Sequence, residues 1–144
     1  MMRGMTGGMW QTTLAACALL VAALGSVPCS AADSVFGPWR IEQARSEPIL
    51  DKRRARIDFG VDGRLTGHTS CNAMTGSYKL EGNVLKVGPV ATTRMACAQL
   101  QLEQEDRILT ALELAVSARV RDDGLLELRD AEGRGLLRAT RFEP

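Results

Sequence analysis

Histidine and aromatic side chains are scarce in this sequence of 144 residues. It contains one tyrosine, three phenylalanines, two tryptophans and a single histidine, His68. A catalytic triad would have to form around His68, and the nearby Ser70 comes without a positioned third group. The sequence also lacks a phosphate-binding loop, a zinc-binding helix motif and a dinucleotide fingerprint. We therefore predict no enzyme and no cofactor, with a weak hydrolase built on His68 as an alternative.

The sequence has no excess of either charge. Its 18 lysines and arginines stand against 17 aspartates and glutamates, and Arg3 is the only charged residue before Asp33. Charges of both signs are scattered along the chain, so the net field does not attract nucleic acid or an anionic membrane. Nucleic acid is therefore not an expected partner.

No hydrophobic run is long enough to span a bilayer comfortably. The apolar stretch over residues 14–24 follows Arg3 and has the length of a signal-peptide core. Small residues at positions 30–32 complete the pattern that signal peptidase cleaves, here before Asp33.

We therefore expect a signal peptide over residues 1–32 and one mature domain over residues 33–144. This domain would be periplasmic or secreted and would keep no stable membrane span. Residues 14–17 also match a lipobox. A lipoprotein anchored through an acylated Cys17 is therefore the alternative.

Cysteine is also rare once the signal peptide is removed. Of four cysteines, Cys17 and Cys29 leave with it, and Cys71 and Cys97 remain. A pair of cysteines in an oxidising compartment most simply forms a disulfide. Closing a loop of about 26 residues would stabilise the domain by roughly 3.5 kcal/mol in the chain-entropy model.

Alternating apolar and polar residues predict short strands along most of the mature chain. The expected strands cover residues 35–44, 55–61, 64–69, 76–80, 84–87, 118–121, 125–129 and 136–142. Asp62-Gly63 predicts a hairpin with a type I′ turn, in which both central residues have positive φ. Glu81-Gly82-Asn83 predicts a second hairpin on the same basis.

One segment has a helical period instead. Residues 99–117 contain no glycine or proline, and their apolar residues repeat at helical spacing. The predicted apolar stripe consists of Leu102, Ile108, Leu109, Leu112, Ala115 and Val116. An α+β fold follows, mainly β, with a curled antiparallel sheet or partial barrel of about seven or eight strands packed on one helix.

A group of rare residues extends from the end of the first expected hairpin to the first turns of the helix. The group comprises Gly67, Cys71, Asn72, Gly76, Tyr78, Thr93, Met95, Cys97 and a glutamate at 103 or 105. At these spacings the chain resembles the META domain family of HslJ-like proteins, from about residue 36 to the C-terminus. The family commonly has glycine where this chain has Ser70. The resemblance implies a compact β fold around a helix, exported or lipid-anchored and linked to heat shock or envelope stress, without an established catalytic site.

For most of these residues a structural role is the simpler reading. Asn72 suits a turn, Gly67 and Gly76 suit close backbone approach, and Tyr78 suits a half-buried strand position. Arg94 and His68 are the candidates for contact with a ligand or partner. Arg94 could instead pair with an acidic residue, and the sequence leaves both roles open.

A soft-metal site is a further alternative. His68, Cys71, Met74, Met95 and Cys97 carry the imidazole and sulfur ligands that favour Cu(I), provided that the cysteines stay reduced. Against it, both methionines suit core packing. The leading prediction is a non-enzymatic envelope or stress accessory protein that binds a protein partner or an apolar ligand. An acyl chain would need a cavity near Met74, Met95 and Leu109.

Overall fold

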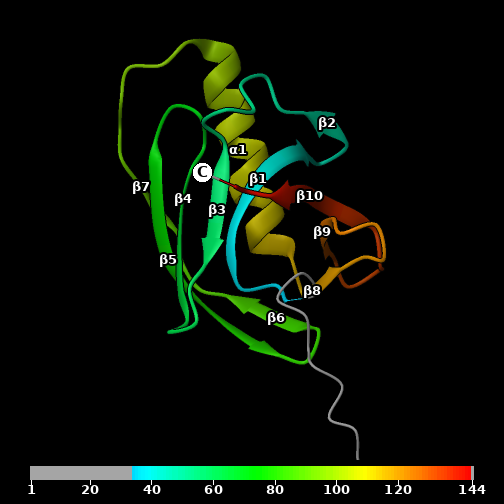
Figure 1. Cartoon of the computed structure of the whole chain (residues 1–144). Helices are drawn as coiled ribbons and strands as arrows, with labels where there is room; N and C mark the ends of the chain where they lie inside the picture. Colours follow the sequence, from blue (N-terminus) through cyan, green and yellow to red (C-terminus); the bar gives the residue numbers. More distant parts are fainter. Residues whose placement is uncertain (1–33, 144) are drawn as a thin grey trace, which may run out of the picture.

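The computed structural model describes residues 34–143 (Figure 1). The expected signal peptide, its cleavage site and Cys17 lie outside the described residues. Among the described residues, no helix has the length and apolarity needed to cross a membrane. The elements in chain order are β1 (Gly37–Ala44), β2 (Glu47–Pro48), β3 (Arg56–Phe59), β4 (Arg64–His68), β5 (Ala73–Glu81), β6 (Val84–Val87), β7 (Ala91–Thr92), α1 (Gln99–Leu114), β8 (Ser117–Val120), β9 (Leu126–Arg129) and β10 (Gly135–Arg141).

The strands form one antiparallel sheet that closes on itself. Its order is β10-β9-β8-β6-β5-β4-β3-β1, and β10 also pairs with β1, which completes a ring of eight strands. The short strands β2 and β7 pair with β1 and β5 outside this ring. The ring is irregular, because β6 and β8 pair in register only at Val84 and Ser117. The predicted mainly β fold with one helix is confirmed.

The core lies inside this ring and is covered by α1. In β1 and β3, Trp39, Ile41, Ile57 and Phe59 are fully buried, as their alternating positions predict. Helix α1 packs against β1, β9 and β10, and Figure 1 shows it running alongside β1. The expected strands after the helix are confirmed as β8, β9 and β10.

The predicted apolar stripe of the helix is partly wrong. Leu102 is 40% exposed, and Val116 lies beyond the end of α1 and is 43% exposed. The buried stripe consists of Gln104, Ile108, Ala111 and Leu112. It contains a glutamine because tertiary hydrogen bonds satisfy that side chain, and hydrophobic periodicity does not detect such bonds.

The hairpins are present, but the predicted turn type is wrong. Gly63 has a φ of 81°, whereas Asp62 is not among the residues with positive φ. Gly60 accepts from the Gly63 N–H and donates to the Arg64 carbonyl, as in a three-residue loop with a glycine bulge. In the second hairpin only Gly82 has positive φ.

Two adjacent non-glycine residues have positive φ in the turn between β1 and β2. The φ angles are 50° for Arg45 and 68° for Ser46, the signs of a type I′ turn. The Arg45 N–H donates to the Leu136 carbonyl at 2.7 Å, which ties the turn to β10. The sequence contains no Asn-Gly or Asp-Gly signal for this turn.

Candidate functional site

The rare residues of the sequence motif meet where three segments come together. These segments are the turn from β4 to β5, residues 93–97 and the first turns of α1. A disulfide joins Cys71 to Cys97, with their Cα atoms 6.1 Å apart. The predicted disulfide is therefore present, and it fastens the turn to the segment that leads into the helix.

Asn72 is the centre of the hydrogen bonds in this region and is 2% exposed. Its side-chain amide donates to the two Glu105 carboxylate oxygens at 3.0 and 3.3 Å. Its Oδ1 accepts from the Thr93 hydroxyl at 3.0 Å and from the Met95 N–H at 2.8 Å. One side chain thus links the β4–β5 turn to both other segments, so the turn role predicted for Asn72 understates its contacts.

The helix contributes two side chains to the same network. Glu105 accepts from the Thr69 hydroxyl at 2.6 Å as well as from Asn72. Gln104 donates to the Thr69 carbonyl and to the Ser70 hydroxyl, each at 2.8 Å. Its Oε1 accepts from the Leu50 N–H at 2.7 Å. Both side chains are therefore fully engaged in holding the loops on the helix.

Ser70 has a backbone conformation that favours glycine. Its φ is 88°, in the region that side chains with a Cβ rarely adopt. The Ser70 hydroxyl donates to the Asp51 carbonyl at 3.0 Å and accepts from Gln104. These two bonds offset part of the backbone cost in this chain.

Gly67 and Gly76 lie where the backbone is closely approached, as predicted. A Cβ on Gly67 would collide with the Arg56 carbonyl oxygen and the Met74 methyl group. A Cβ on Gly76 would lie 2.9 Å from the Pro89 carbonyl oxygen. These glycines allow β4 to pack on β3 and let the loop after β6 lie on β5.

Gly67→Ala is expected to lower the free energy of unfolding by about 2 kcal/mol, because backbone atoms of β3 have to move. Gly135→Ala is the matched control, since its new Cβ would meet Glu127 Oε1 at an ordinary 3.4 Å. Urea unfolding of both variants measures the difference. Equal stabilities for the two variants would contradict the close approach at Gly67.

Tyr78 has the structural role that the sequence predicts, but it is buried rather than half-buried. Its side chain is 5% exposed, and its ring meets Phe59 edge-on with centroids 5.0 Å apart. The hydroxyl donates to the Gly60 carbonyl at 2.6 Å. Burial raises the pKa of Tyr78, followed by the nearby charges of Asp62 and Asp58. The phenol therefore remains a neutral donor that anchors the β3–β4 loop.

His68 and Ser70 do not form a nucleophile and base pair. His68 Nδ1 accepts from the Ser70 backbone N–H at 3.1 Å, while the Ser70 hydroxyl faces Asp51 and Gln104. Burial and the charges of Arg56 and Arg54 lower the pKa of His68. His68 is therefore not positioned to take a proton from the Ser70 hydroxyl. Arg94 is exposed on the loop before α1.

The two methionines of the soft-metal hypothesis lie in different environments. Met74 is 2% exposed inside the ring, whereas Met95 is 65% exposed, so the prediction of Met95 as a core residue is wrong. The disulfide leaves neither Cys71 nor Cys97 as a thiolate ligand. Copper binding remains a hypothesis for the reduced protein alone.

A second polar cluster, which was not predicted from the sequence, lies on the outer face of β8–β10. Glu127 lies between three arginines, with Arg119 at 3.2 Å, Arg129 at 2.8 Å and Arg138 at 3.6 Å. Burial by itself raises the pKa of Glu127, but the bonds and charges of Arg129 and Arg119 outweigh it and the net pKa is lowered. Outward-facing charged positions in the three last strands were its only sequence signal.

Known proteins resemble this chain in sequence and in fold. It is 32% identical over 73 residues to the heat shock protein HslJ of Escherichia coli, a match that spans about half of each protein: 50% of this chain and 51% of HslJ. An NMR structure of a protein from Burkholderia xenovorans is similar with a TM-score of 0.58 and 20% identity, over 74% of this chain and 83% of that one. A second NMR structure has a TM-score of 0.53 and 28% identity, over 72% and 88% of the two chains.

A crystal structure of a DUF4847 family protein from Bacteroides vulgatus shares the fold at 15% identity, with a TM-score of 0.54 over 75% of this chain and 94% of that one. The family model described as the META domain matches residues 33–142. That range contains the disulfide, the Asn72 network and the whole ring of strands. The chain belongs to the META domain family.

Proposed function

We propose that this protein is an exported accessory protein of the bacterial envelope. It binds a partner protein under stress conditions and catalyses no reaction. Its family membership and its similarity to a protein named for heat shock support a role in stress. The signal-peptide pattern of residues 1–32 and the disulfide support an oxidising compartment. Hydrogen bonds within the protein already occupy the side chains of Ser70, Asn72 and Glu105, which fits a structural role better than a reactive site.

The observation that carries the binding role is a groove between α1 and the loop after β6. It has a volume of about 420 Å³ and is lined by Val87, Gly88, Pro89, Val90, Leu109 and Glu113. Its loop wall is held in place, because Gly88 donates to the Ser77 carbonyl at 2.8 Å. Four of the six lining residues are apolar with side chains, and Glu113 adds one negative charge. We infer that the occupant is an apolar segment of a protein that also carries a basic side chain.

An acyl chain is a less suitable occupant than a protein segment. The acyl-chain hypothesis places Met74, Met95 and Leu109 around one cavity. Leu109 lines the groove, but Met74 is buried inside the ring and Met95 is exposed on another loop. The loop and the helix alone therefore bound the groove. A space of this kind suits a few neighbouring side chains of a partner protein better than a long acyl chain.

Survival of the host under heat or envelope stress tests the groove. A strain lacking this protein should survive poorly, and the wild-type protein should restore survival. Glu113→Lys should fail to restore it, because it reverses the charge at the groove. Glu103→Lys, on the same helix but away from the groove, is the control and should restore it. Full rescue by Glu113→Lys at equal protein level would rule out this groove as the partner site.

Intact mass spectrometry tests the proposed export. The intact mass of the protein isolated from the envelope should equal that of residues 33–144 and should rise by about two hydrogen masses after reduction of one disulfide. A mass that includes Cys17 and a lipid would support the anchored alternative. The full-length mass in the cytosol with reduced cysteines would refute export.

A further inference from the structure

The outer face of β8–β10 presents positive charge although the chain as a whole is nearly neutral. Strand pairing sets Arg119 opposite Glu127 and Glu127 opposite Arg138, in one row across three strands. The Glu127 side chain is 3% exposed, whereas those of Arg119 and Arg138 are 48% and 46% exposed. The carboxylate is covered and the guanidinium groups face the solvent.

The three arginines are not equally committed to Glu127. Arg129 uses both its Nε, at 2.9 Å, and its Nη2, at 2.8 Å. Arg119 uses one nitrogen at 3.2 Å, and Arg138 lies at 3.6 Å, the longest of the three. Since a guanidinium has five N–H donors, Arg119 and Arg138 keep donors for another acceptor.

These arginines line a groove of about 460 Å³ that also contains acidic side chains. Arg121 belongs to it and pairs with Asp123 at 3.0 Å, and Asp122 lines the same groove. The groove thus contains four arginines and three carboxylates, Glu127 included. Four guanidinium groups against three carboxylates leave one net positive charge in the groove, and Arg119 and Arg138 are the arginines with the longest contacts to Glu127.

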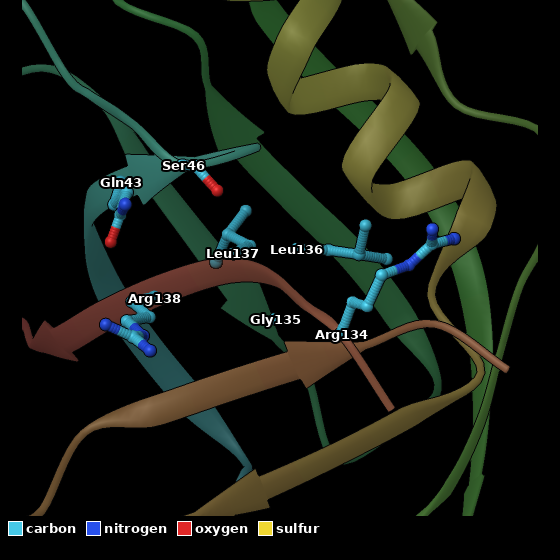
Figure 2. Close-up of a pocket in the computed structure, with 7 residues that line it drawn as sticks. All are labelled: Gln43, Ser46, Arg134, Gly135, Leu136, Leu137 and Arg138. Atoms are coloured by element: carbon cyan, nitrogen blue, oxygen red, sulfur yellow. The ribbon is translucent and has the colours of Figure 1, made fainter. Parts of the chain in front are cut away.

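A second groove, of about 470 Å³, shares Arg138 with the first. Figure 2 shows Gln43 and Arg138 close together at one end of it and Arg134 at the other. Ser46, from the turn with two positive φ angles, lines the same groove. Backbone strain of this kind in residues other than glycine concentrates at functional sites. Gln43 and Ser46 add uncharged hydrogen-bonding groups beside the arginines.

We propose that the two grooves together bind a phosphate group carried on a hydroxylated molecule. Arg119 and Arg138 hold the phosphate, and Gln43 and Ser46 bond its hydroxyl groups. A phosphate has more acceptor oxygens than a carboxylate, so it can accept from the N–H groups that Arg119 on β8 and Arg138 on β10 do not direct at Glu127. The same chemistry occurs in a free sugar phosphate and in a phosphoglycerol lipid headgroup. This site shares no lining residue with the groove at Leu109 and is independent of the proposed function.

Titration of the disulfide-bonded protein with glucose 1-phosphate, followed by amide NMR, tests the site. Saturable shifts are expected in β8–β10 and at residues 43–46, and glucose alone should cause none. Arg138→Gln should weaken binding by about tenfold, the effect of one lost charge-assisted hydrogen bond. Arg64→Gln, at an arginine whose side chain is 71% exposed in β4, should leave the affinity unchanged.

Vesicles distinguish the two sources of phosphate. Binding to phosphatidylglycerol vesicles but not to glucose 1-phosphate, with the same loss in Arg138→Gln, would assign the site to a lipid headgroup. Phosphatidylcholine vesicles are the control. No binding to either phosphate probe, or an equal loss in Arg64→Gln, would overturn the proposal. Glu127 keeps Arg119 and Arg129 in Arg138→Gln, so this variant should fold, and Arg119→Gln provides a second test.

Discussion

Loss of the Cys71–Cys97 disulfide is expected to lower the free energy of unfolding by about 3.5 kcal/mol. The bond closes a loop of 26 residues that contains β5, β6 and β7, and the open unfolded chain gains the entropy of that loop. For a domain of this size the midpoint of thermal unfolding should fall by about 15 °C or more. Thermal and urea unfolding of the Cys71→Ala, Cys97→Ala double variant measure the loss.

Reductant supplies the control for this disulfide. It should destabilise the wild-type protein to the level of the double variant and leave the double variant unchanged. A double variant within about 1 kcal/mol of the wild type would show that the Asn72 network alone holds the two segments together.

Asn72→Ala is expected to cost about 3–4 kcal/mol, because it removes the partner of several groups at once. The Met95 N–H and the Thr93 hydroxyl lose their acceptor, and Glu105 loses two bonds from the amide. Asn83→Ala, in the exposed hairpin turn between β5 and β6, is the control and should cost under about 0.5 kcal/mol. Urea unfolding of both variants measures the difference. Equal costs would mean that the network contributes little.

A second substitution at the same position separates the network from simple loss of volume. Asn72→Asp keeps the shape and the acceptor oxygen but places a carboxylate against Glu105. Two carboxylates in contact raise the pKa of one of them, so the folded variant binds a proton more readily than the unfolded chain does. Its deficit relative to the wild type should therefore shrink as the pH falls toward about 4. A deficit independent of pH would contradict the contact with Glu105.

The disulfide and the network act on the same two segments. Cys71 and Asn72 are consecutive, and Met95 is two residues from Cys97. Residues that share partners do not have additive effects on stability. The triple variant Cys71→Ala, Asn72→Ala, Cys97→Ala should therefore lose a free energy of unfolding that differs from the sum of the two separate losses. The sign of that difference reports whether the disulfide and the Asn72 network stabilise each other.

Much of the fold could be predicted from the sequence because its signals are local. Alternation in residues 55–61 places Ile57 and Phe59 on one face whatever the rest of the chain does. The absence of glycine and proline from residues 99–117 likewise predicts the helix. The pair Cys71 and Cys97 could be predicted as a disulfide once the other two cysteines were assigned to the signal peptide.

The candidate sites depended on contacts between distant segments. Gln104 is polar in sequence and buried in the structure, because Leu50, Thr69 and Ser70 supply its partners. Met95 has the side chain of a core residue, yet only its backbone N–H joins the network while its side chain faces solvent. No local pattern encodes either result.

Residue types at short spacing were enough to predict most of the strands, the helix, the disulfide and the resemblance to the META family. The closure of the sheet, in contrast, rests on the pairing of β1 with β10, which became visible in the folded chain. That closure sets Arg138 beside Gln43, about a hundred residues apart in the chain. The register of three strands surrounds Glu127 with arginines. The physical reason is that register and closure are chosen by the packing of the whole core, which no single segment contains.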